Sequence, residues 1–212
     1  MALENTLRAF ELAIEHRLDM AELDVHLARD GQLVVVHDAD LARLFGRAEQ
    51  VADLTTAELG AAGVPSLAEV LAVARGCLGL YVELKGPGTG TALGALVASG
   101  AASNVALIGG SFEPALVHDL RAANPTIPRS VLFGRASVAE MIDVCRALQA
   151  RYAHPCFRPI TAAIVDGLHD ADLLVMTPHT NDPAEAREFA VLGVDVIASD
   201  DPRVLRPLVS AA

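Results

Sequence analysis

The strongest constraint on the fold is a regular alternation of strand and helix along most of the chain. Short apolar segments typical of strands each precede a helical segment, and they lie at residues 80–85, 105–108, 130–133, 151–154, 173–177 and 194–199. Strands that alternate with helices in this way form parallel βαβ units. The sequence therefore predicts an α/β protein. No linker or low-complexity run divides residues 1–212, so we predict a single domain.

The number of strands favours a TIM-type barrel. Residues 20–25 add a seventh parallel strand, and the chain opens with a helix that has no strand before it. A (β/α)8 barrel has eight strands, each of which precedes its helix. We therefore predict such a barrel, with its first strand missing from the chain as given. An open doubly wound sheet is the alternative, but it usually has fewer units and a crevice motif that we do not find.

Residues 20–38 are typical of two strands joined by a tight turn. Asp30-Gly31 is a hairpin signal, because glycine adopts the positive φ that such turns need. Side chains alternate across a strand, so Glu22 and Asp24 point to one face. The second strand, which we expect to lie outside the parallel sheet, leads to His37. The carboxylates suit a hard divalent cation and the imidazole suits proton transfer. An ordinary acidic surface hairpin is the alternative.

Glu83 and Lys85 share one face of the strand at 80–85, and Lys85 is the only lysine in the chain. Ammonium and guanidinium groups are not interchangeable at a tight site, so this position indicates a need for an ammonium; a bias against lysine is the alternative. The carboxyl ends of barrel strands meet at one mouth. Three carboxylates there would need a cation, Mg²⁺ or Ca²⁺.

The composition argues against several classes of partner and location. A formal net charge of −11 disfavours non-specific binding to nucleic acid. No apolar run reaches the roughly 18 residues of a membrane span, and the N-terminus lacks the features of a signal peptide. The cysteines, Cys77, Cys145 and Cys156, are odd in number and lack metal-ligand spacing. We therefore expect reduced, buried thiols in a cytoplasmic protein.

A series of short motifs runs along nearly the whole chain. The motifs are Glu4-Asn5-Thr6, Glu22-Leu23-Asp24-Val25, Asp30-Gly31 with Val35-Val36-His37-Asp38, residues 64–71, Glu83-Leu84-Lys85, Ser111-Phe112, Thr180-Asn181-Asp182-Pro183, and Gly193-Val194-Asp195 with Ser199-Asp200. In these motifs the chain resembles a known family, the glycerophosphodiester phosphodiesterases, which have a phospholipase-C-like barrel. The order and spacing of the motifs are more specific than any motif alone.

The resemblance implies that a small phosphodiester is hydrolysed to sn-glycerol 3-phosphate and an alcohol with the help of a divalent metal. It also implies a role for each candidate residue. The implied site consists of the metal ligands Glu22, Asp24 and Glu83, the phosphate contact Lys85, the general acid–base His37, and the substrate-pocket candidates His154 and Asn181.

Two features depart from the family pattern. Pro178-His179-Thr180-Asn181 stands where the family has an aromatic residue, and no His-Arg-Gly tripeptide precedes Glu4. In the family that tripeptide ends the first strand, so its absence coincides with the strand missing from the count. We therefore expect the chain as written to be a truncated form that is weakly active or inactive and self-associates through open barrel edges.

Two other functions stay open at this point. The first alternative is an inactive relic of the family that still binds metal or phosphate. The second is a barrel aldolase-type lyase in which Lys85 forms a Schiff base.

Overall fold

The computed structural model describes residues 2–209 and divides into two compact units. Unit 1 consists of Met1–Ser111 and Ala115–Ile127, and unit 2 consists of Phe112–Pro114 and Pro128–Ala212. Within residues 2–209, no helix combines the length and the apolar character that crossing a membrane requires.

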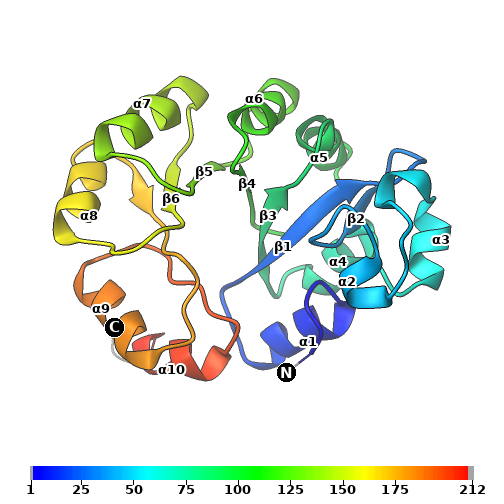
Figure 1. Cartoon of the computed structure of the whole chain (residues 1–212), viewed down its shortest axis with the longest axis horizontal. Coiled ribbons are helices and arrows are strands. Elements are labelled where there is room, and N and C mark those ends of the chain that lie inside the picture. Colours follow the sequence, from blue (N-terminus) through cyan, green and yellow to red (C-terminus); the bar gives the residue numbers. More distant parts are fainter. Residues whose placement is uncertain (1, 210–212) are drawn as a thin grey trace. The chain divides into compact units, whose positions relative to one another are not determined.

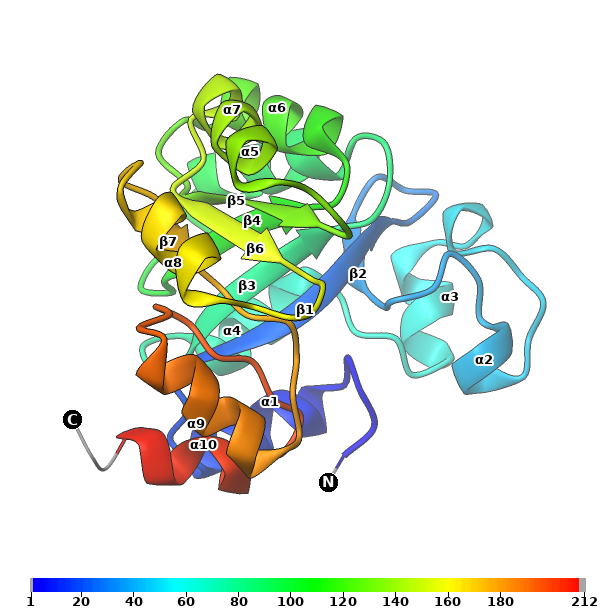
Figure 2. The ribbon, with the colours of Figure 1, turned by 60° about the vertical axis from the view of Figure 1, so that its left-hand side comes forward.

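A mainly parallel sheet forms the centre of unit 1. Strands β1 (Met20–Leu27), β3 (Gly79–Leu84) and β4 (Leu107–Ser111) are parallel in that order, and β2 (Leu33–Val35) pairs antiparallel with the other edge of β1. Figures 1 and 2 show β1 and β3 side by side. The second strand of the hairpin, which we expected to lie outside the sheet, is instead an antiparallel edge strand of it, because it pairs with β1 over three residues.

The turn between β1 and β2 uses the glycine that the sequence indicates. Gly31 has a φ of +76°, and its N–H donates to the carbonyl of Ala28 at 2.9 Å, while the Ala28 N–H donates to the carbonyl of Gln32 at 2.9 Å. A left-handed residue at the end of a three-residue connection lets the chain reverse with the twist that a hairpin needs.

Helices pack against the sheet of unit 1 and bury its apolar side chains. Leu23 of β1 and Leu80 of β3 are fully buried in the core. Ser66 and Glu69 form a capping box at the start of α4 (Leu67–Ala74). In Figure 2 the segment with α2 (Ala42–Phe45) and α3 (Thr56–Ala61) lies beyond β2, away from β3. The helices are α1 (Leu7–Glu15), α2 (Ala42–Phe45), the 3₁₀ helix η1 (Val51–Asp53), α3 (Thr56–Ala61), α4 (Leu67–Ala74), α5 (Thr89–Ala98) and α6 (Pro114–Ala123).

Unit 2 continues the alternation of strand and helix. Its parallel strands are β5 (Arg129–Phe133), β6 (Tyr152–Pro155) and β7 (Leu174–Val175), in that order. Its helices are α7 (Val138–Leu148), α8 (Ala162–His169), α9 (Pro183–Val191) and α10 (Pro202–Val209).

The predicted strand at 194–199 is wrong. The segment forms only an isolated parallel bridge, between Met176 and Val196. Side chains take backbone donors on both sides of this bridge. Oδ2 of Asp195 accepts the N–H of Val175 at 2.8 Å, and Oγ1 of Thr177 accepts the N–H of Ala198 at 3.4 Å. A regular parallel ladder would use both donors, so pairing is limited to one bridge.

The prediction of three buried thiols is also wrong in part. All three cysteines are free; Cys145 is buried and Cys156 is half-buried, but Cys77 is exposed. Cys77 lies in the turn between α4 and β3, where its N–H donates to the carbonyl of Ala74 at 2.9 Å. Connecting turns run over the surface, so this side chain faces solvent.

Candidate active site

Three carboxylates converge on one face of the sheet of unit 1. Glu22 and Asp24 belong to β1 and Glu83 to β3, and Asp24 and Glu83 are direct neighbours in the parallel register. One carboxylate oxygen from each of the three residues lies within 4.8 Å of the others. Alternation along β1 and pairing with β3 therefore produce the cluster, and Asp24 is only 5% exposed.

Lys85 follows β3 directly and brings the only lysine of the chain into this cluster. The backbone N–H of Lys85 donates to the backbone carbonyl of Val25 at 3.1 Å, which extends the pairing of β1 with β3 by one hydrogen bond. Its Nζ lies 2.7 Å from Oε1 of Glu83 and 3.2 Å from Oδ1 of Asp24. We call Glu22, Asp24, Glu83 and Lys85 the acidic cluster.

The acidic cluster carries more negative than positive formal charge, since three carboxylates surround one ammonium. Burial raises the pKa of Glu83, because a desolvated carboxylate is costly even beside Lys85. For Lys85, burial alone would lower the pKa, but the hydrogen bond to Glu83 and the charge of Asp24 outweigh it and raise the pKa. Hard oxygen ligands with excess negative charge fit a divalent cation such as Mg²⁺ or Ca²⁺.

His37 lies just after β2 and belongs to a chain of charged contacts. Its Nδ1 lies 2.7 Å from Oδ1 of Asp38, and the other oxygen of Asp38 accepts from Nε of Arg43 at 2.5 Å. Arg43 also donates to Oε1 of Glu4 at 2.5 Å. Arg43, and to a smaller degree the His37 ring, lower the pKa of Asp38. Asp38 is therefore a fixed negative charge behind the imidazole.

The surroundings of His37 hold its backbone and leave its ring accessible. Nε2 of His26 lies 3.0 Å from the carbonyl oxygen of His37, and the side chain of His37 is 50% exposed.

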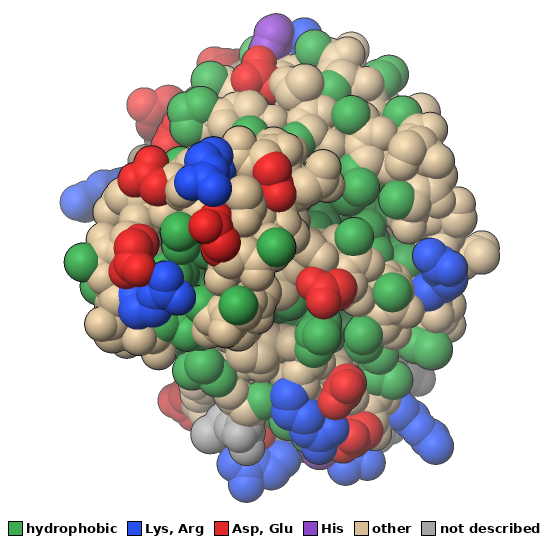
Figure 3. Space-filling model, turned by 90° about the vertical axis from the view of Figure 1, so that its right-hand side faces the viewer, with side chains coloured by type: hydrophobic (Ala, Val, Ile, Leu, Met, Phe, Trp, Pro, Cys, Tyr) green, Lys and Arg blue, Asp and Glu red, His purple; other side chains and the backbone are tan. Residues whose placement is uncertain are grey.

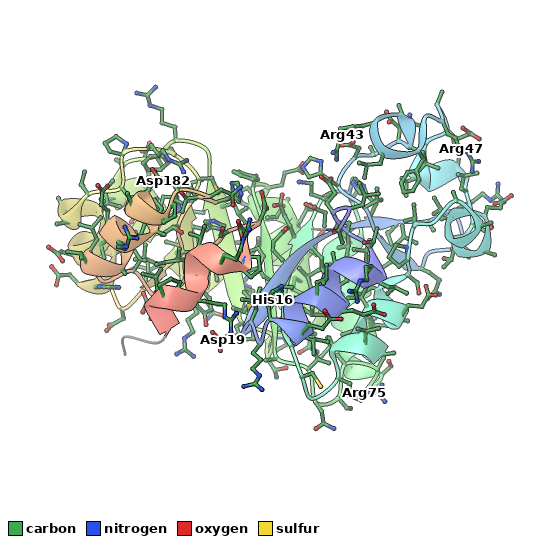
Figure 4. The ribbon with its side chains drawn as sticks, turned by 90° about the horizontal axis from the view of Figure 1, so that it is seen from below. His16, Asp19, Arg43, Arg47, Arg75 and Asp182 are labelled. Carbon is green, nitrogen blue, oxygen red and sulfur yellow. The ribbon has the colours of Figure 1, made fainter. Side chains whose placement is uncertain are left out.

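Figure 4 labels Arg43 and Arg47 on the segment that contains α2. In the face shown in Figure 3, acidic and basic side chains are intermixed, and Arg47 and Glu49 of this segment form an ion pair at 2.7 Å.

His154 and Asn181 both belong to unit 2, where each is engaged by local hydrogen bonds. Nε2 of His154, at the end of β6, lies 2.8 Å from the carbonyl oxygen of Thr177, and burial lowers the pKa of His154 to about 4. The Oδ1 of Asn181 accepts from Oγ of Ser199 at 2.9 Å and from the N–H of Asp200 at 3.0 Å. Both side chains are therefore fixed by the chain around them.

Sequence reasoning missed two residues that contact the predicted site. Asn5 is quoted only as part of a family motif, but its amide contacts Asp24. Asp38 is part of a quoted motif but is not predicted as a partner of His37. Its position directly after the histidine is a signal for that contact, whereas nothing in the sequence indicates the contact of Asn5.

The chain is similar to known phosphodiesterases. Residues 1–85 match the model of the Glycerophosphoryl diester phosphodiesterase family. A glycerophosphodiester phosphodiesterase of Bacillus altitudinis is 32% identical over 226 residues, covering 94% of this chain and 89% of that protein. The structure of a glycerophosphodiester phosphodiesterase from Agrobacterium tumefaciens has a TM-score of 0.80 at 28% identity, covering 98% of this chain and 94% of that one.

A further solved structure shares the fold. It is an Oleispira antarctica phosphodiesterase in complex with its product sn-glycerol-3-phosphate, with a TM-score of 0.84 at 23% identity, covering 97% of this chain and 91% of that one.

The chain belongs to the glycerophosphodiester phosphodiesterase family, a family of phosphoric diester hydrolases. The resemblance found in the sequence is thereby confirmed. The predicted fold class, an α/β protein of the TIM-barrel type, is also confirmed by the likeness to the solved phosphodiesterases. The single domain and the missing first strand stay predictions.

Proposed function

We propose that this chain hydrolyses glycerophosphodiesters to sn-glycerol 3-phosphate and an alcohol, with Mg²⁺ or Ca²⁺ held by Glu22, Asp24 and Glu83. The observation that carries the proposal is the convergence of these three carboxylates within 4.8 Å, in a chain of this family. The product bound to a relative of the same fold supports the class of substrate.

The chemistry of the acidic cluster fits this reaction. A bound divalent ion would polarise a phosphoryl oxygen as a Lewis acid. Lys85 has three N–H donors, of which two point to Glu83 and Asp24. We propose that the third donates to an oxygen of the phosphodiester and so orients the anion at the cluster.

His37 is placed to transfer a proton. A carboxylate can only accept hydrogen bonds, so Nδ1 of His37 carries the hydrogen toward Asp38 and Nε2 is the nitrogen that gains or loses a proton. The charged carboxylate of Asp38 holds the ring through this contact, because a hydrogen bond to an ionised acceptor is stronger than one to a neutral acceptor. We propose that His37 protonates the oxygen of the leaving alcohol, which avoids the release of an alkoxide into water.

For His154 and Asn181 we propose roles in shaping the substrate pocket. The lowered pKa of His154 keeps its ring neutral near pH 7, so it would offer an uncharged surface to a substrate. The Asn181 amide holds Ser199 and Asp200, so it would fix the segment that follows Val196.

The aldolase hypothesis is opposed by the surroundings of Lys85. A Schiff-base lysine needs a neutral amine, which a lowered pKa supplies. The pKa of Lys85 is raised, because the contacts with Glu83 and Asp24 outweigh the effect of burial. The ammonium is therefore maintained, which suits contact with an anion and not attack on a carbonyl.

The proposal is tested by an assay of glycerophosphocholine hydrolysis, with sn-glycerol 3-phosphate measured as the product. We expect product in the presence of Mg²⁺ or Ca²⁺, none in excess EDTA, and about 10²–10⁴-fold slower formation of product by a His37→Gln variant. If the chain binds metal but forms no product, the inactive relic is the better description. If product forms at the same rate in EDTA, the metal-dependent mechanism is wrong.

A further inference from the structure

We propose that Asn5 is a positioning residue, whose amide fixes the orientation of the Asp24 carboxylate for cation binding; this rests on the proposed role of Asp24 as a metal ligand. Asn5 precedes α1 and lies 19 residues before Asp24 in the sequence. The Glu4-Asn5-Thr6 motif does not indicate which residue Asn5 contacts, so the inference comes from its contacts in the structure.

The amide of Asn5 contacts both the side chain and the backbone of Asp24. Its Nδ2 donates to Oδ2 of Asp24 at 2.9 Å, and its Oδ1 accepts the N–H of Asp24 at 3.2 Å. The other carboxylate oxygen, Oδ1, lies 3.2 Å from Nζ of Lys85. The carboxylate is thus held from both sides, by Asn5 at one oxygen and by Lys85 at the other.

The second contact replaces a rung of the sheet. The Val36 N–H donates to the carbonyl of Asp24 at 3.0 Å. The regular antiparallel pairing stops at the neighbouring pair, Val25 and Val35, and does not include Asp24 and Val36. In a regular ladder the two residues of such a pair exchange both hydrogen bonds, so the Asp24 N–H would donate to Val36. The Asn5 amide accepts that N–H instead.

Both the chemistry and the backbone conformation at position 5 favour asparagine. The two contacts need one donor and one acceptor on the same side chain, which an amide supplies. Asn5 has a φ of +55°, in the left-handed region where asparagine is enriched and β-branched or bulky residues are outliers. The left-handed turn before Thr6 lets the short side chain reach back to β1.

The test separates the amide from the backbone conformation. Glycine adopts a positive φ without strain, so Asn5→Gly removes the amide and keeps the turn. Asn104 is a matched control, because it is exposed, belongs to unit 1 and has a φ of +65°. Calorimetric titration with Mg²⁺ and with Ca²⁺ then gives the affinity of wild type, Asn5→Gly and Asn104→Gly.

We expect Asn5→Gly to bind metal about 10–100-fold more weakly, the usual cost of losing a partner that orients a ligand. Asn104→Gly should bind like wild type, and both variants should unfold within a few degrees of each other in EDTA. If wild type binds no metal, the proposed function fails. If wild type and Asn5→Gly bind equally well, the role of Asn5 is overturned while the proposed function stands.

A second measurement uses the wild-type chain and needs no variant. In a ¹H–¹⁵N spectrum, the side-chain amide signals of Asn5 should shift as metal is added, because Asp24 would then share its charge with the ion. The side-chain signals of Asn104 should stay in place. Unchanged Asn5 signals at metal saturation would contradict the proposal even if the Asn5→Gly variant failed to fold.

Discussion

The two units each hold a group of charged and polar side chains, and the two groups differ in how many carboxylates converge and in which elements hold them. In unit 2, Asp200 contacts Nε2 of His179 at 2.6 Å and Nδ2 of Asn181 at 3.2 Å. Glu185 is bound through both oxygens by Arg158, at 2.5 and 2.8 Å, which lowers the pKa of Glu185 to about 2. Each of these carboxylates is matched by donors within the chain.

The acidic cluster of unit 1 differs in composition and in support. It brings together three carboxylates and the ammonium of Lys85. Their positions are set by the paired strands β1 and β3, whereas His179, Asn181 and Asp200 lie outside regular strands and helices. Three carboxylates that converge on paired strands are the better candidate for a cation site, and carboxylates bound one by one on loops are better candidates for a structural role.

The largest effect should come from removing one carboxylate of the acidic cluster. Asp24→Asn should weaken Mg²⁺ or Ca²⁺ binding by more than about 100-fold, since losing a ligand costs more than losing the residue that orients it. Asp200→Asn, the matched change in unit 2, should leave the affinity unchanged. Equal losses in both variants, measured by calorimetry, would break the contrast between the units.

The next largest effect should come from the proton-transfer residue. His37→Gln should lower kcat by about 10²–10⁴-fold, the usual contribution of a general acid–base residue, with metal affinity unchanged because His37 is not part of the acidic cluster. Steady-state assays of glycerophosphocholine hydrolysis measure the first quantity and metal titration the second. A parallel fall in metal affinity would show that His37 acts through the cluster.

Asp38→Asn should give a smaller loss of kcat than His37→Gln. The variant keeps a group beside Nδ1 of His37 but removes the negative charge of Asp38, so the ring is held by a weaker, neutral contact. Steady-state assays of glycerophosphocholine hydrolysis by both variants measure the two losses. A kcat equal to that of wild type would mean that Asp38 serves only to hold Arg43.

Metal should also stabilise the fold. A ligand at 100 times its Kd raises the free energy of unfolding by about 2.7 kcal/mol if it does not bind the unfolded chain. Thermal unfolding of wild type should therefore shift upward with metal and back with EDTA. Glu22→Gln should lose most of this shift and Asp200→Asn should keep it. A full shift in Glu22→Gln would remove Glu22 from the site.

The last effect concerns unit 2 and pH. The pKa of His154 is about 4 in the folded chain and would be about 6.5 when unfolded. Between these values the unfolded chain binds more protons, so the free energy of unfolding should fall as the pH is lowered from 6.5 to 4. The free energy of unfolding of His154→Gln, measured in urea at each pH, should depend less steeply on pH in this range. The difference from wild type corresponds to at most one proton bound on unfolding.

The outline of the acidic cluster could be predicted from the sequence, because it depends on regular geometry. Alternation along a strand puts Glu22 and Asp24 on one face, and parallel pairing places Glu83 beside them. Asn5 could not be predicted, since its contact depends on a left-handed turn and on the place where β2 leaves β1. Segment 194–199 was predicted wrongly because side chains take the place of backbone pairing there.

The central claim is that Glu22, Asp24 and Glu83 form one site for a divalent cation, and calorimetric titration tests it most directly. Mg²⁺ and Ca²⁺ should each bind wild type saturably at one ion per chain, and Glu83→Gln should abolish or greatly weaken that binding. An absence of saturable binding to wild type at millimolar metal, or undiminished binding to Glu83→Gln, would contradict the account.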